Sequence, residues 1–197
     1  MDKAIIGLIG VFLGAALSIT RELWLDYRSQ KKKAEYLAIL VACILDRYVD
    51  GCVSVVSDNG LTNQDGITVT QVTTPDLDLN SIDVDWQSLP SDLMYEILSF
   101  PNLIEEANHK ISSVAEYVAS PPDFEEVYEE RHYEYAILGI KAAQLAEKFR
   151  QTYSLPIRDF NSWNPIEYMK QKKAEISSIR LERERAHASF IAASNIS

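Results

Sequence analysis

AIIGLIGVFLGAALSIT, residues Ala4–Thr20, is a run of 17 residues without a charged side chain. This length lies at the lower end of what a helix needs to cross the roughly 30 Å hydrocarbon core of a bilayer. Trp24 and Tyr27 follow the run at the position where aromatic residues of a membrane–water interface lie. The pattern predicts an N-terminal transmembrane anchor over residues 1–20, in contact with membrane lipid.

The charges on either side of this segment predict how the anchor is oriented. Lys3 and the amino terminus precede it, whereas a larger basic set follows: Arg21, Arg28, Lys31, Lys32 and Lys33. Because the more basic flank stays in the cytoplasm, we expect the amino terminus outside and the C-terminal domain in the cytoplasm. The chain would then be a single-pass protein of the plasma (inner) membrane. The five basic residues, with Trp24 and Tyr27, are its expected membrane-interface residues.

Two other interpretations of the segment stay open. Cleavage after Ala16-Leu17-Ser18 would release a secreted or periplasmic bundle that binds a ligand or partner, but Met1–Lys3 is a weak basic region and the following charges resist export. The segment would otherwise be a soluble or peripheral helix. Cys43 and Cys52 lie on one expected helix, about 13–14 Å apart along its axis. Because that is too far for a disulfide, the free thiols favour a reducing compartment.

Small residues recur within the expected anchor. Gly10, Gly14 and Ser18 follow one another at intervals of four, with Gly7 beside them. Such a stripe lets the backbone of a second membrane helix approach closely. It predicts self-association through the anchor, although small residues are also common in apolar segments without that role.

Apolar residues at helical spacing predict that the rest of the chain is an all-α bundle. Residues 21–57 form the juxtamembrane part and the first bundle helix, with an inward seam of Leu37, Val41, Ile44, Tyr48, Gly51 and Val55. Residues 91–191 hold three more helices, and residues 192–197 form a tail. The first of these three begins at Ser91 and should kink or restart at Pro101, and the last begins at a capping box, Asn164–Glu167. An antiparallel four-helix-type bundle is the simplest arrangement.

The seams of these three helices can also be predicted. The helix after Ser91 turns inward Ile104, Ala107, Ile111, Val114 and Val118; the next runs to about Tyr153 and turns inward Tyr128, Tyr135, Leu138, Ala142, Leu145 and Phe149; the last turns inward Ile166, Met169, Ile176 and Ile179. Beyond Arg180 the apolar spacing decays, so we expect an exposed, charge-rich helix there.

Residues 58–90 form a long acidic loop without helical period. Polar and apolar residues alternate over Ile67–Val72 and Leu77–Trp86, which predicts short extended segments. Their apolar side chains should pack on the bundle: Leu77, Leu79, Ile82, Val84 and Trp86. The loop resembles the start of a calcium-binding loop, but Ser81 and Gln87 stand where the turn glycine and the bidentate glutamate belong.

The net charge of −10 is unevenly distributed along the chain. Residues 58–130 hold 16 acidic residues and one basic residue, Lys110, whereas residues 131–197 hold 11 basic and 7 acidic residues. This pattern argues against a nucleic-acid-binding protein, which would present a concentrated basic face. It allows a basic protein partner on an acidic face formed by residues 58–130.

All three histidines lie in Glu-x-x-His motifs: Glu106–His109, Glu129–His132 and Glu184–His187. Di-iron bundles use two such motifs and a glutamate from each of two other helices, for which Glu35 and Glu175 are the candidates. The helical phase places the motifs outside the inward seams, on solvated surface, so a di-iron enzyme is only the third possibility. No catalytic, cofactor-binding or metal-binding residue is predicted.

We therefore expect a membrane-anchored helical bundle that acts as an interaction or scaffold module.

Overall fold

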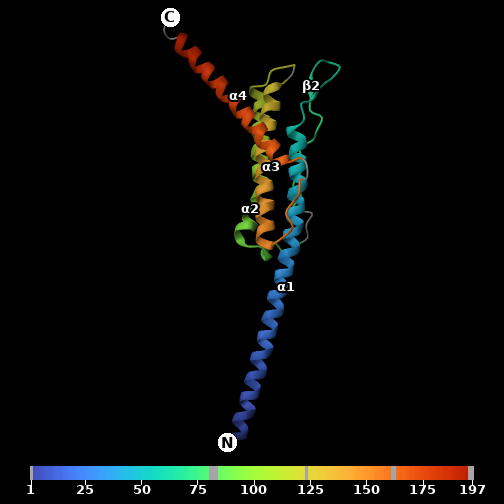
Figure 1. The fold of residues 1–197 in the computed structure, drawn as a ribbon, viewed down its shortest axis with the longest axis vertical. Helices are drawn as coiled ribbons and strands as arrows, with labels where there is room; N and C mark the ends of the chain where they lie inside the picture. Colours follow the sequence, from blue (N-terminus) through green and yellow to red (C-terminus); the bar gives the residue numbers. More distant parts are fainter. Residues whose placement is uncertain (1, 80–83, 123, 161–162, 195–197) are drawn as a thin grey trace.

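The computed structural model describes residues 2–79, 84–122, 124–160 and 163–194, without the side chains of residues 2–13, 15, 16, 193 and 194. The described chain is a helical bundle (Figure 1), as predicted. Its helices are α1 (Asp2–Val56), α2 (Ser91–Tyr117), α3 (Glu125–Tyr153) and α4 (Pro165–Ser194). Two short strands, β1 (Leu61–Thr62) and β2 (Thr68–Val69), pair antiparallel, and a 3-10 helix, η1 (Trp86–Ser88), precedes α2.

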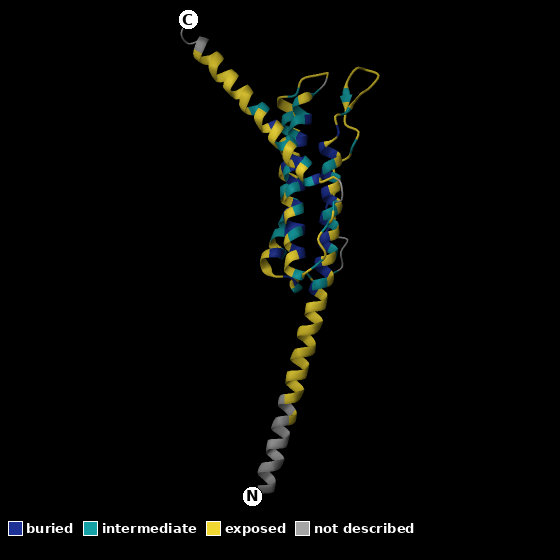
Figure 2. Ribbon diagram, in the orientation of Figure 1, coloured by how far each residue is buried: buried dark blue, intermediate teal, exposed yellow. Residues whose placement is uncertain are grey.

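Helix α1 has two parts that differ in burial. Residues 17–33, called the stalk below, are all exposed, and the first buried residue is Ala34. Figure 2 shows this part of α1 extending alone from one end of the bundle. From Ala34 onward one face of the same helix is buried, and every member of its predicted seam is buried or half-buried.

The expected membrane span falls largely outside the residues described in full. Within those residues, no helix combines the length and apolar character needed to cross a membrane. Most of Ala4–Thr20 belongs to the part of α1 whose side chains are not described. The structure therefore supports the helical bundle but identifies no transmembrane helix among the residues it describes.

Helix α3 lies at the centre and is antiparallel to each of the other three helices. The direction follows from paired contacts with α1 (Arg131–Asp58 and Arg150–Asp46), with α2 (Tyr135–Asn108 and Lys148–Glu96) and with α4 (Glu129–Arg180 and Gly139–Met169). Helices α1, α2 and α4 consequently share one direction. The expected alternation of direction between successive helices is wrong for α1 and α2.

The long connection between α1 and α2 explains this topology. It returns along α1, where Leu77 and Leu79 are buried and Pro75 packs against Gly51. Val84 and Trp86 pack on the core near its end, so the predicted packing of these extended segments is confirmed. Ile82 lies outside the described residues. Because the chain has come back to the stalk end before Ser91, α2 must run in the same direction as α1.

Helix α2 differs from its prediction in two places. It passes through Pro101 without ending, so the expected restart is wrong. Val118, expected in the seam, lies just after the helix and is 57% exposed. The buried residues of α2 lie mainly in its first half: Leu93, Ile97, Phe100 and Ala107.

Helices α3 and α4 follow their predicted seams more closely. All six predicted inward residues of α3 are buried. The Asn164 side chain accepts hydrogen bonds from the Ile166 and Glu167 N–H groups at 2.9 and 3.3 Å, which confirms the N-cap of α4. Residues 181–192 are exposed, and α4 projects past the bundle in Figure 1. The helix runs to Ser194, so it extends into the expected tail.

Candidate functional site

The stalk carries the expected membrane-interface residues. Leu17, Trp24 and Tyr27 are 71%, 57% and 70% exposed. The Arg28 guanidinium lies 5.3 Å from the centroid of the Trp24 ring, and Arg21 and Lys31–Lys33 are exposed. The lysines thus come immediately before the first buried residue of the bundle.

The small-residue stripe can be placed only in part. A Cβ atom at Gly14 would meet no heavy atom within 4 Å among the described residues, and Ser18 is exposed. Gly7 and Gly10 lie outside the side chains that the structure describes. The described half of the stripe is therefore open to another helix.

At the far end of α1, a buried ion pair joins α1, the loop and α3. Asp58 and Arg131 are both buried, and Arg131 Nη1 donates a hydrogen bond to Asp58 Oδ2 at 2.9 Å. The Asp58 carboxylate also accepts three backbone N–H groups at 3.0 Å, from Gly60, Gln71 and Val72. Burial would raise the pKa of the Asp58 carboxyl, but these donors outweigh it and lower the pKa to about 2. We call this cluster, with His132, the distal junction.

His132 contradicts the expectation that all three Glu-x-x-His motifs are solvated. It is buried, and its Nε2 lies 2.8 Å from the Asp58 carbonyl oxygen, to which it donates. Burial, with nearby Lys172 and Arg131, outweighs the Asp58 carbonyl and carboxylate and lowers the pKa of His132. Helical phase could not predict this position, because it depends on the contact with Asp58, 74 residues earlier in the chain.

The other motif residues have simpler positions. His109 and His187 are exposed, as predicted. Glu129 is largely buried, contrary to prediction, and forms ion pairs with Arg180 at 2.9 Å and Arg183 at 2.7 Å. Among the described residues, no group of three or more His, Cys, Asp or Glu side chains could hold a metal ion.

The uneven charge of the sequence is partly balanced inside the bundle. Basic residues after position 130 pair with acidic residues before it: Arg131 with Asp58, Lys148 with Glu96, and Arg180 with Glu129 and Glu130. These ion pairs neutralise part of the acidic surplus of residues 58–130. Asp65 and Glu116 are among the described acidic residues of this range that form no ion pair.

These two carboxylates lie at the distal end, which comprises the β1–β2 hairpin and the loop residues 118–122. The Thr68 N–H donates to the Pro122 carbonyl at 3.1 Å and so joins the hairpin to that loop. Large apolar side chains are exposed here: Leu61, Ile67, Val69, Tyr117 and Val118. The distal end thus combines apolar side chains with negative charge.

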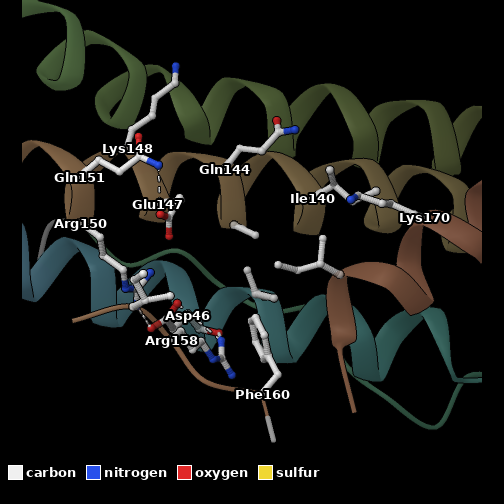
Figure 3. A pocket seen from close by; sticks show the side chains of 14 residues that line it. Asp46, Ile140, Gln144, Glu147, Lys148, Arg150, Gln151, Arg158, Phe160 and Lys170 are labelled. Atoms are coloured by element: carbon white, nitrogen blue, oxygen red, sulfur yellow. Dashed lines mark hydrogen bonds and ion pairs between the residues drawn. The ribbon is translucent and has the colours of Figure 1, made fainter. Parts of the chain in front are cut away.

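A cleft of about 390 Å³ lies between α1, α3, the start of α4 and residues 157–160 (Figure 3). At one end the Asp46 carboxylate pairs with Arg150, and the Asp46 backbone carbonyl accepts a hydrogen bond from Arg158. Arg158 also forms an ion pair with Asp50 at 2.7 Å. Glu147 and Lys170 lie on other walls, as Figure 3 shows. No sequence pattern predicts this cleft, because it depends on where α4 begins in space.

A comparison of the chain with protein-family models, curated proteins and solved structures found no match in any of the three. The stalk, the distal end and the cleft are the candidate functional features of the described residues.

Replacement of Asp58 by Ala leaves the Arg131 guanidinium buried without its carboxylate. We expect the free energy of unfolding to fall by about 3–5 kcal/mol, as for other broken buried ion pairs. Urea denaturation of the purified chain in detergent, followed by circular dichroism, measures it. The matched control is Glu96→Ala, which breaks the half-exposed pair with Lys148 and should cost about 1 kcal/mol or less. Equal losses in the two variants would contradict a special role for the distal junction.

Mild acid should weaken the bundle through His132. Its pKa is lower in the folded than in the unfolded chain, so the folded state binds fewer protons as pH falls below the unfolded value of about 6.5. The stability that the neutral imidazole contributes is complete above that pH and is lost as pH falls toward the folded pKa.

The measurement is the melting temperature between about pH 7.5 and 5.5, on either side of the unfolded pKa. His132→Gln, which keeps a donor for the Asp58 carbonyl, should flatten the fall, whereas His109→Gln on the exposed face of α2 should not. An identical pH profile for wild type and His132→Gln would refute this role.

Proposed function

We propose that this protein is a membrane-tethered interaction module, with the bundle held in the cytoplasm on the helical stalk. The observation that carries the proposal is the exposure of large apolar side chains on a helix that continues into the bundle core. Leu17, Leu23, Trp24 and Tyr27 are each more than half exposed. Exposed apolar surface of this kind marks contact with lipid or with another protein.

The order of residues along α1 favours lipid over water at its N-terminal end. Ala4–Thr20 carries no charge, and Trp24, Tyr27 and the basic residues follow it in the sequence typical of a membrane boundary. Lys31–Lys33 would then lie near the cytoplasmic headgroups, where each lysine near the surface contributes about 1 kcal/mol of attraction to anionic lipid. Gly10, Gly14 and Ser18 would be available for self-association within the bilayer.

The tether would point the distal end away from the membrane. The α-helical rise puts Val56 about 54 Å beyond Thr20. The apolar side chains and the carboxylates of Asp65 and Glu116 suit a partner segment that is basic and apolar. Within the acidic segment of residues 58–130, we propose the distal end as the surface that binds this partner.

Topology tests this proposal. A reporter that is active only outside the cytoplasm, fused to the C-terminus, should be inactive, and the full-length chain should pellet with membranes. Replacing Lys31, Lys32 and Lys33 together by Gln should raise reporter activity, since it removes charge that holds the flank inside. The matched control replaces Lys170, Lys172 and Lys173 by Gln, which lie on α4 far from the stalk.

Three outcomes would overturn parts of the proposal. An active reporter on a chain about 18 residues shorter, as expected for signal cleavage, would mean a secreted bundle. An active reporter on the full-length chain would support the anchor but show that its orientation is the opposite of the one proposed. Recovery of the full-length chain in the soluble fraction would show that Ala4–Thr20 does not anchor it in a membrane.

A further inference from the structure

The cleft of Figure 3 exists because α4 begins only halfway along α3. The chain leaves α3 at Tyr153 and returns beside α1, where Arg158 binds Asp46 and Asp50, before α4 starts at Pro165. Met169, one turn into α4, already lies against Gly139. The part of α3 from Ile140 to Gln151 therefore has a side that α4 does not cover, and the cleft lies there.

The walls of the cleft are partly apolar. Five of the side chains that line it are buried or half-buried and apolar: Val49, Ile140, Ala143, Phe160 and Ile166. A sixth, Ile157, is 78% exposed. The other eight lining residues are polar or charged, and a volume of about 390 Å³ lies in the range of small-molecule sites.

One charge in the cleft lacks a counter-ion. The other charged lining residues each have an ion-pair partner: Asp46, Lys148, Arg150, Arg158 and Lys170. Glu147 accepts a hydrogen bond from Gln151 at 3.1 Å, but no cation lies within ion-pair distance of it among the described residues. In Figure 3 the Glu147 carboxylate extends from α3 toward the cleft, whereas Lys148 extends toward α2.

We propose that this cleft binds a small organic monocation with an apolar body, whose ammonium group pairs with Glu147. The body would pack on Val49, Ala143 and Phe160, which removes its apolar surface from water. The charged head would then satisfy the one unpaired charge of the lining. The inference does not depend on the membrane tether, because none of these residues belongs to the stalk.

The first test uses the full chain in phosphatidylcholine nanodiscs and 4-phenylbutylamine as the probe. Equilibrium dialysis, corrected with empty nanodiscs, should give saturable binding of one probe per chain. The matched neutral compound, 4-phenyl-1-butanol, has the same apolar body and should bind at least tenfold more weakly. Absence of saturable amine binding, or equal binding of the alcohol, would overturn the proposal.

Variants locate the site. Glu147→Gln should weaken amine binding at least tenfold, whereas Glu105→Gln, an exposed glutamate of α2 outside the cleft, should leave it unchanged. Glu147→Lys should lose the amine and gain binding of 4-phenylbutyrate. Ala143→Trp should fill the cleft and abolish binding, and Ile157→Lys repels the amine from an exposed position if Ala143→Trp does not fold. Amine binding that survives both Glu147→Gln and the cleft variant would place the site elsewhere and refute the proposal.

Discussion

The backbone hydrogen-bond ladder of α1 runs without a break from Asp2 to Val56, and the path of the rest of the chain follows from where this helix ends. The same helix supplies the exposed stalk and, from Ala34 onward, a buried face of the bundle. A helix transmits orientation along its axis because each residue is held by its neighbours one turn away. Because no non-helical linker separates the stalk from the bundle, we expect the bundle to be held rigidly relative to the stalk.

Two consequences follow from this rod. The chain leaves α1 at the distal end and returns along the bundle before α2 begins, and the distal junction holds the start of that return. Asp58 lies two residues after the end of α1, and its carboxylate accepts hydrogen bonds from three loop N–H groups and the Arg131 guanidinium. The chain turns back a second time after Tyr153, and α4 begins only about halfway along α3. The part of α3 that α4 does not cover forms a wall of the cleft beside Glu147.

Apolar spacing was enough to predict the helices and most of their buried residues, because a seam such as Tyr128, Tyr135, Leu138 and Phe149 repeats with the helical period. It could not predict the direction of α2, which depends on where residues 72–90 lie. Nor could it find Asp58–Arg131, two residues 73 positions apart, or the burial of His132, which comes from that contact. The predicted restart of the helix at Pro101 was wrong, since α2 continues through this residue. The Glu147 cleft depends on three separate segments meeting, so no local pattern indicates it.

The most direct test of the central claim is the distance between the stalk and the bundle in a bilayer. Spin labels are attached at Arg28→Cys and Ser54→Cys, both exposed positions of α1, in a Cys43→Ser background. Pulsed electron paramagnetic resonance then measures the distance between the two labels. An unbroken helix predicts one narrow distance distribution near 39 Å, from the rise per residue. A broad distribution, or one centred well below that distance, would show a hinge between stalk and bundle and contradict the rigid mounting.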